Sequence, residues 1–243
     1  MSLPDLRGDY HVHSTFSDDA ESTLAENLVA AADRGLTHIR LVEHVRRSTT
    51  WLPDFVAALA GEERPEGLVV HNGVEAKLLD AAGSLDVPED LAGIETILIA
   101  DHQFPGPEGP WSPEETRRRL DGGLAVGEAL DMLIGALVAA MEATGAAGSN
   151  QSAQLAHCFS ILPKIGLDED QLSDGQLARW ASAAATTGTL VEVNEKWACP
   201  GPRALEAAVA ADVTLVAATD SHVATDVGRY RRVAELIGQV GAR

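Results

Sequence analysis

Cysteine, basic residues and long hydrophobic runs are all scarce in this sequence of 243 residues. Its two cysteines, Cys158 and Cys199, are too few for a disulfide framework or a cysteine metal cluster. No unbroken apolar segment is long enough to cross a bilayer, and residues 1–9 lack the apolar region of a signal peptide. We therefore expect a soluble, cytoplasmic protein with no membrane partner.

The shortage of positive charge limits the partners of the chain. Lysine and arginine total 18 against 37 acidic residues, so the formal net charge is −19. Such a chain repels phosphate backbones, and the sequence has no basic segment interleaved with aromatic residues. Long nucleic acid is therefore an unexpected partner, although bound metal ions can reverse the charge locally. The sequence does not define the oligomeric state.

Strand-like and helical patterns alternate along the whole chain. The predicted strands lie at 9–13, 38–42, 68–75, 94–100, 154–157, 189–193 and 213–218. Helices are predicted at 27–34, 53–60, 124–143, 177–185 and 202–211, with a further helix after residue 112 and another near residue 236. This alternation indicates parallel βαβ units, and about seven strands suit a closed barrel better than an open sheet. We expect one α/β domain over residues 1–243.

Two of these helices have specific start signals. Thr23 and Glu26 form the pattern of a capping box, and Gly35 is placed to end the same helix. Ser112 precedes Pro113 and Glu115, which predicts a second capping box. This second helix belongs to a predicted helical insertion at about 104–154, which is long enough to cover an active-site rim as a lid.

The most informative stretch runs from Asp9 to Asp19. Side chains alternate along a strand, so His11 and His13 point to the same face. Two carboxylates, Asp18 and Asp19, follow on a polar loop. Imidazole and carboxylate together suit divalent ions such as zinc, manganese and iron.

Further acidic residues and histidines fall at the carboxyl ends of separate predicted strands. They are His11, His13, Glu43, His44, Glu75, Asp101, His102, His157, Asp220 and His222. A parallel barrel brings these strand ends together on one rim, so six of the eight histidines would converge with carboxylates. His38 begins its strand, and His71 lies deeper than Glu75, so we interpret both as structural. The convergence predicts a metal site.

The same segments carry a resemblance to a known family. They are His11-Val12-His13-Ser14, Glu43-His44, Gly73-Val74-Glu75, His102, Ala156-His157 and Asp220-Ser221-His222. As a set, which extends from Asp9 to Tyr230, they resemble the PHP (polymerase and histidinol phosphatase) superfamily of metal-dependent phosphoesterases. The resemblance implies a distorted seven-stranded (β/α)7 barrel that binds two or three divalent metal ions (Zn, Mn or Fe).

The resemblance also implies a division of the ligands among the metals. One ion would be held by His11, His13, Glu75 and Asp220, and Glu75 would bridge to a second ion held by His102 and His157. A third would take His44, His222 and the acidic loop, where spacing favours Asp19 over Asp18. Many relatives have an apolar residue where Asp101 stands, and we expect Asp101 to orient His102.

These ligands define the expected chemistry. A carboxylate can bridge two cations, and paired metals can lower the pKa of a water molecule to yield hydroxide as nucleophile. We expect Glu75, Asp220 and His222 to be the catalytic residues. No side-chain nucleophile is then needed, so Ser221 and Cys158 are expected to face away from the metals.

Substrate phosphate needs cations beyond the metals. The basic residues that follow predicted strands are Arg46, Arg47, Lys164, Lys196, Arg203 and Arg229, and the best placed are Lys164, Lys196 and Arg203. The run from Arg117 to Arg119 is interpreted as a solvated helix face with a minor lid role. Glu192 and Asn194 share a face that can point inward, with no role assigned.

The leading hypothesis is a metal-dependent hydrolase of a small phosphomonoester, for which histidinol phosphate is one possible substrate. The first alternative is a phosphodiesterase or exonuclease that acts on nucleotides, which the acidic composition disfavours for long substrates. The second alternative is a non-catalytic, metal-binding structural or regulatory module. A nearly complete ligand set disfavours it, since a decayed site should show gaps.

Overall fold

A seven-stranded parallel sheet forms the centre of the protein. The computed structural model describes residues 3–145 and 150–241. The strand order is β1 (Gly8–Val12), β2 (His38–His44), β3 (Val69–Lys77), β4 (Thr96–Ala100), β7 (Ser152–Ala156), β8 (Leu190–Asn194) and β9 (Leu215–Ala218). All six neighbouring pairs are parallel. The predicted strands are therefore confirmed to within a few residues.

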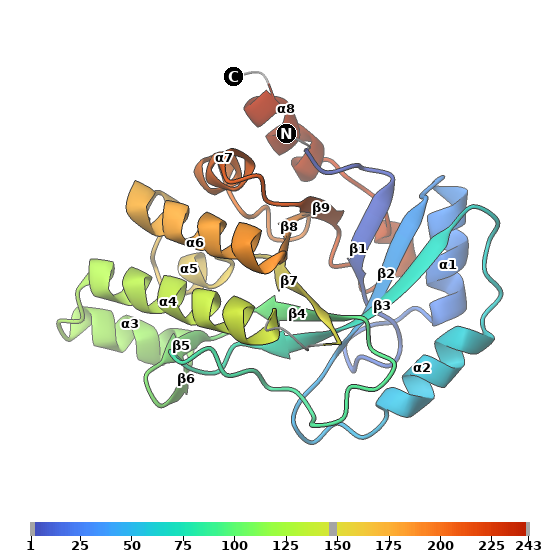
Figure 1. Cartoon of the computed structure of the whole chain (residues 1–243), viewed down its shortest axis with the longest axis horizontal. Helices are drawn as coiled ribbons and strands as arrows, with labels where there is room; N and C mark the ends of the chain where they lie inside the picture. Colours follow the sequence, from blue (N-terminus) through green and yellow to red (C-terminus); the bar gives the residue numbers. More distant parts are fainter. Residues whose placement is uncertain (1–2, 146–149, 242–243) are drawn as a thin grey trace.

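The first and last strands of this sheet meet along a short seam. Val12 forms an isolated parallel bridge with Ser221, just beyond β9. The amide of His13 donates to the carbonyl oxygen of Ser221 at 2.8 Å. This contact makes the sheet a nearly closed barrel (Figure 1).

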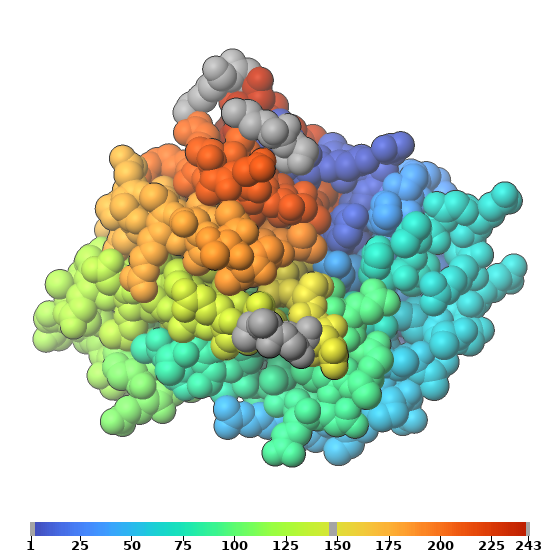
Figure 2. Space-filling model, viewed as in Figure 1, coloured from blue at the N-terminus to red at the C-terminus, as the bar shows by residue number. Residues whose placement is uncertain are grey.

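Helices cover the outside of the barrel. They are α1 (Leu24–Asp33), α2 (Leu52–Gly61), α3 (Pro113–Asp121), α4 (Val126–Thr144), α5 (Ile161–Lys164), α6 (Asp174–Thr187), α7 (Pro202–Ala210) and α8 (Arg232–Gly241). Two short 3-10 helices, η1 (Glu169–Gln171) and η2 (Ala224–Asp226), lie in loops. In the view of Figure 2, α4, α6 and α7 lie side by side over one face, from yellow-green to orange.

The sequence signals at two helix starts have different outcomes. At α1 the capping box is confirmed, with Thr23 and Glu26 bonded reciprocally, and Gly35 follows the helix with φ of +70°. At α3 the Ser112 side chain accepts from the Glu115 amide, as predicted. The Glu115 carboxylate instead pairs with Arg118 and Arg119, at 2.6 and 2.8 Å. Two guanidinium groups one turn away compete successfully with the single cap amide.

The segment predicted as a helical insertion at 104–154 belongs largely to the barrel. It contains a short hairpin, β5 (Phe104–Gly106) and β6 (Gly109–Trp111), followed by α3 and α4. Helix α4 is the crossover between β4 and β7, and it buries Leu130, Leu133 and Leu137 in the main core. Residues 146–149 of this range lie outside the described residues.

The register of the sheet aligns the predicted ligands. His44 on β2 lies opposite Glu75 on β3, and β3 in turn pairs with β4, which ends just before Asp101. Because all strands run in the same direction, their carboxyl ends form one rim. Below the rim, the barrel interior holds a small apolar cluster together with buried polar residues, including Arg40, Gln154 and Glu192.

Among the described residues, no helix combines the length and the apolar character that a membrane span requires.

Candidate metal centre

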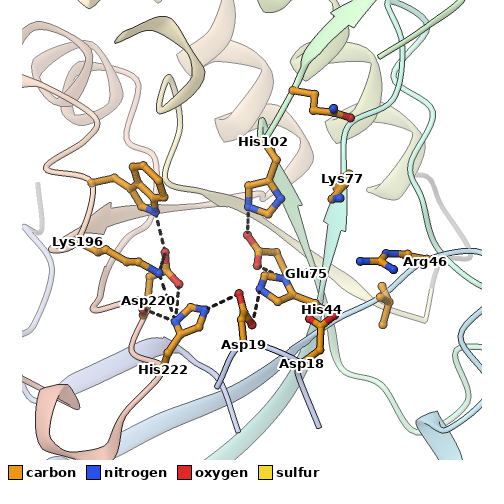
Figure 3. Close-up of a pocket in the computed structure, with 13 residues that line it drawn as sticks. Asp18, Asp19, His44, Arg46, Glu75, Lys77, His102, Lys196, Asp220 and His222 are labelled. Carbon is orange, nitrogen blue, oxygen red and sulfur yellow. Dashed lines mark hydrogen bonds and ion pairs between the residues drawn. The ribbon is translucent and has the colours of Figure 1, made fainter. Parts of the chain in front are cut away.

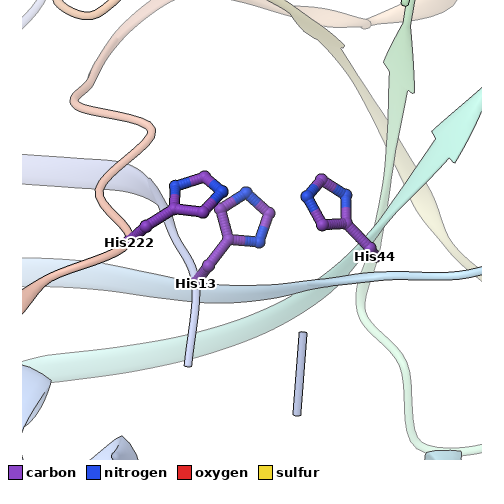
Figure 4. A group of neighbouring side chains, drawn as sticks. All are labelled: His13, His44 and His222. Atoms are coloured by element: carbon purple, nitrogen blue, oxygen red, sulfur yellow. The ribbon is translucent and has the colours of Figure 1, made fainter. Parts of the chain in front are cut away.

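The predicted ligands converge on the rim of the barrel. Three sets of ligand atoms each lie within 4.8 Å of one another: His11, His13 and Asp220; Glu75, His102 and His157; and His13, His44 and His222. The third set is shown in Figure 4, where all three rings gather from separate segments. Since His13 belongs to two sets, these groups adjoin.

Glu75 lies at the centre of the site. The nearest nitrogen of each of five imidazoles is within 3.5 Å of its carboxylate: those of His11, His13, His44, His102 and His157. Atom Oε1 faces His102 and His157, at 3.0 and 2.8 Å. Atom Oε2 is buried and accepts no well-oriented hydrogen bond, although His44 Nδ1 is 2.9 Å away. The two oxygens thus face different sets of histidines.

The acidic loop contributes Asp19, as the spacing favours. Its carboxylate oxygens lie 3.5 Å from His44 Nε2 and 3.3 Å from His222 Nε2. Asp18 also lines the hollow but forms no such pair (Figure 3). Asp19 therefore lies beside two members of the third set, His44 and His222.

Asp220 connects the histidine sets to the loop that follows β8. Its Oδ1 is 3.3 Å from His13 Nε2. Its Oδ2 accepts a hydrogen bond of 2.7 Å from the Trp197 indole and lies 3.4 Å from the Lys196 ammonium. The carboxylate is thereby fixed between the histidines and two residues of the loop after β8.

A layer of buried polar residues supports His11 from below. Glu192 Oε2 lies 3.1 Å from His11 Nδ1 and accepts from Gln154 Nε2 at 2.7 Å. On its other side, Gln154 accepts a hydrogen bond from Arg40, which reaches across the barrel interior from β2. With Nδ1 of His11 engaged, its Nε2 faces His13 Nε2 at 3.0 Å. Such outer hydrogen bonds set the orientation of a ligating imidazole.

Two other histidines are oriented through serines. His13 Nδ1 is 3.3 Å from Ser17 Oγ, and the Ser17 hydroxyl donates to Glu43 at 2.6 Å. His157 Nδ1 is 3.1 Å from Ser160 Oγ, and the Ser160 hydroxyl donates to Asp101 at 2.9 Å. The expectation that Asp101 orients His102 is therefore wrong, because its carboxylate turns toward Ser160 and His157.

Burial and neighbouring charges shift the pKa values at the rim. Burial lowers the pKa of His13 to about 3 and raises that of Glu43 to about 7. Burial opposes ionisation of Glu75, but the charges of His102 and His11 outweigh it and hold its pKa well below the usual range. At neutral pH His13 is therefore neutral and Glu75 is anionic, and these are the forms that bind metal ions.

The rim encloses a hollow of about 350 Å³ that presents three basic side chains. Lys196 and Arg46 were both among the predicted rim cations, whereas Lys77, from the strand of Glu75, was not (Figure 3). Lys77 was missed, although it follows Glu75 by two residues and so shares its face. Trp197 was also missed, and its only sequence signal is its position next to Lys196.

Two predicted substrate residues lie elsewhere. The Arg203 guanidinium pairs with Asp174 at 2.7 Å and donates to the Asp170 carbonyl, so it does not line the hollow. The nearby carboxylate at the start of α6 outcompetes the rim for this charge. Lys164 also lies outside the hollow, with its ammonium 4.1 Å from the centre of the Trp197 ring.

The segment predicted to act as a lid, residues 104–154, does not reach the hollow in the described part of the chain. No described residue of 104–154 lines the hollow. The Arg117 guanidinium instead donates to the Lys164 carbonyl, and Arg119 stacks over Trp111 at 4.0 Å. The arginine run is therefore partly engaged in packing rather than being a wholly solvated face.

The residues interpreted as structural make contacts away from the predicted ligand atoms. His38 and His71 stack on each other at 5.8 Å, away from the rim. The Ser221 hydroxyl donates to the Val223 carbonyl at 2.6 Å, and Cys158 is buried in the main core.

Comparisons with known proteins give partial matches in sequence and a fuller one in structure. No family model matches the chain. A probable phosphatase of Thermoanaerobacter sp. is 32% identical over 96 residues, which is 38% of each protein. A probable phosphatase of Vibrio campbellii is 27% identical over 103 residues, 41% of each. The chain thus matches about two fifths of the length of these curated relatives.

The structural match extends over almost the whole chain. The crystal structure of histidinol phosphate phosphatase from Lactococcus lactis, complexed with zinc, L-histidinol and phosphate, superposes with a TM-score of 0.59. The alignment covers 96% of this chain and 93% of that one at 16% identity. This similarity confirms the fold predicted from the sequence: the chain has the PHP-type (β/α)7 barrel.

Proposed function

We propose that the protein is a metal-dependent phosphatase that hydrolyses small phosphomonoesters. The observation that carries this proposal is the position of Glu75, whose two oxygens face separate sets of histidines beside a hollow with three basic side chains. The names of the sequence relatives support a phosphatase. The bound zinc and phosphate of the structural neighbour are consistent with this chemistry.

The residues at the rim fit divalent metal ions. Buried Glu75 Oε2 lacks a well-oriented donor, and two ring nitrogens, His11 Nε2 and His13 Nε2, face each other at 3.0 Å. A cation would satisfy these atoms, and carboxylate with imidazole suits Zn, Mn or Fe. We assign the ligands as His11, His13, Asp19, His44, Glu75, His102, His157, Asp220 and His222, for two or three ions.

When bound, such ions would lower the pKa of a water molecule and neutralise charge on the phosphoryl oxygens, which makes hydroxide attack the expected route. The chain's own cations can bind the phosphate group of the substrate. Lys196, Lys77 and Arg46 surround the hollow and can hold the phosphate against the repulsion of the acidic protein. Asp220, fixed by Trp197 and Lys196, holds its position at the edge of the site.

The size of the hollow supports a small substrate. At about 350 Å³ it matches the lower range of small-molecule sites. Histidinol phosphate is one candidate, because the structural neighbour binds L-histidinol and phosphate. A phosphodiesterase or exonuclease and a non-catalytic metal-binding module are the competing proposals.

A direct comparison of substrates tests the proposal. The protein is stripped with a chelator, reloaded with zinc, manganese or iron, and screened for phosphate release from small phosphomonoesters. Cleavage of bis(4-nitrophenyl) phosphate and of a single-stranded oligonucleotide is measured at the same metal and salt concentrations. We expect the monoesters to be processed fastest. Faster cleavage of the oligonucleotide favours the nuclease, and no turnover with metals bound favours the non-catalytic module.

A further inference from the structure

A second hollow adjoins the first on the rim. It has a volume of about 410 Å³ and lies between the loops that follow β8 and β9 and the start of α8. Lys196, Asp220 and His222 line both hollows. The two hollows therefore adjoin at these residues, and a molecule whose phosphate lies at the predicted metal ligands would reach the second space by passing over them.

The second hollow is rich in arginine. Besides Lys196, it is lined by Arg229, Arg231 and Arg232. Four of the 18 basic residues of a chain with a net charge of −19 thus surround one space next to the site. Since surface cations in so acidic a protein have many carboxylates to pair with, this concentration needs a reason.

Two of the three carboxylates that line this hollow are engaged by groups other than its arginine side chains. Both oxygens of Glu195 are occupied by the backbone amides of Arg231, Arg232 and Val233, at 3.0–3.1 Å, where they cap α8. Asp220 Oδ2 pairs with the Lys196 ammonium at 3.4 Å, and its Oδ1 faces His13. Only Asp226 remains among the described carboxylates that line this space. The three arginine side chains therefore outnumber the one carboxylate that is left for them.

Two of the arginine side chains are unpaired. Arg232 donates to the Lys196 carbonyl at 3.1 Å and so holds the wall shared by the two hollows. The guanidinium groups of Arg229 and Arg231 have no hydrogen bond or ion pair with any described residue. A guanidinium offers a planar pair of donors that matches a carboxylate or a phosphate.

We propose that the substrate carries a second anionic group, a carboxylate or a phosphate, which binds Arg229 and Arg231 in the second hollow. This inference rests on the proposed phosphatase function, since the first hollow must hold the phosphate that is released. It also distinguishes the substrate from histidinol phosphate, whose alcohol portion bears an amine and no second anion. The substrate class is thus a small phosphomonoester with two anionic ends.

A matched series of aromatic esters tests the proposal. Phenyl phosphate, 4-carboxyphenyl phosphate and 1,4-phenylene bisphosphate differ only in the group opposite the ester. We expect the metal-loaded wild type to prefer the second and third compounds by kcat/KM. In Arg231→Gln and Arg229→Gln this preference should fall about tenfold, the loss expected for one charge-assisted hydrogen bond. The compound whose kcat/KM falls more in these variants shows whether carboxylate or phosphate is the preferred second anion.

Controls separate this proposal from the proposed function. Arg64→Gln removes the same charge from an exposed loop and should keep the wild-type preference. Binding of 1,4-phenylene bisphosphonate and of phenylphosphonate by calorimetry gives the same comparison without turnover. Equal affinities for the two phosphonates, or a preference unchanged in both arginine variants, overturns the second anion site. Absence of phosphate release from every ester overturns the phosphatase, and the calorimetric preference then decides the anion site alone.

Discussion

Glu75 and Glu192 are both buried carboxylates of the barrel, yet their surroundings differ. Glu192 accepts from or contacts four donors: His11 Nδ1, the Gln154 amide, the His157 backbone and the Asn194 amide. Among the described residues, the groups paired with the Glu75 carboxylate are imidazoles, and one of its oxygens has no well-oriented donor. The protein satisfies the hydrogen-bonding capacity of Glu192, whereas Glu75 has capacity left that a bound cation would fill. Under the proposed function, the rim binds the ions and the layer below it holds the rim in place.

Removal of divalent ions should have the largest effect on this arrangement. We expect protein purified without chelator to contain more than one equivalent of zinc, manganese or iron by elemental analysis. Chelation should abolish phosphatase turnover, and the restored metal should recover it, because the rim carboxylates need cations. A folded protein that takes up no metal would contradict the assignment of Glu75 and its neighbours as ligands.

The second largest effect is expected for Glu75→Gln. The amide has nearly the same shape but cannot bridge two cations through anionic oxygens. We expect turnover to fall at least about a hundredfold, since even the outer partners of metal ligands are worth about ten- to a hundredfold. Thermal unfolding should change far less than turnover. Wild-type turnover at full metal occupancy would show that Glu75 is not a ligand.

Glu192→Gln tests the other carboxylate of the comparison. The NH2 group of the glutamine would face groups that themselves donate hydrogen bonds, such as the Gln154 and Asn194 amides. His11 would also lose its anionic partner. We expect metal affinity to fall about ten- to a hundredfold and the unfolding temperature to decrease as well. Metal affinity and unfolding are measured by competition with a chelating dye and by calorimetry. If only the unfolding temperature changes, Glu192 supports the core and not the ligand.

The smallest effect is expected among the rim cations. Lys77→Gln should raise KM for a small phosphomonoester about tenfold, because one charged donor to the phosphate is lost. Arg203→Gln is the matched control, since its guanidinium is bound to Asp174 outside the hollow. Steady-state kinetics of both variants measures the two KM values. A larger effect of Arg203→Gln would restore the role predicted for it from the sequence.

Strand periodicity and strand-end residues were sufficient to predict the barrel and the convergence at its rim. Position along a strand fixes which face a side chain occupies, so His11, His13 and Glu75 were placed without knowledge of the fold around them. The parallel order of the strands then brought them together. Their metal-binding role stays a prediction until ions are measured.

Long flexible side chains on loops were harder to place. Arg203 and Lys164 follow strands as Lys196 does, but their direction depends on partners that are distant in sequence, Asp174 and Trp197. Glu192 and Asp101 posed the same difficulty, since partners such as Gln154 and Ser160 come from distant parts of the sequence. Their partners emerge only when the chain is folded, whereas the face of a strand residue is local.

The short seam between β1 and the end of β9 has a consequence for the stability of the whole barrel. His13 lies on one side of this seam and Asp220 on the other, with their side chains 3.3 Å apart. An ion held by both would cross-link the first strand of the barrel to the last. It would constrain a loop that contains nearly the entire barrel, and long loops gain most from such closure. The amides of His13 and Ser221 should then be the first to exchange with deuterium when metal is removed.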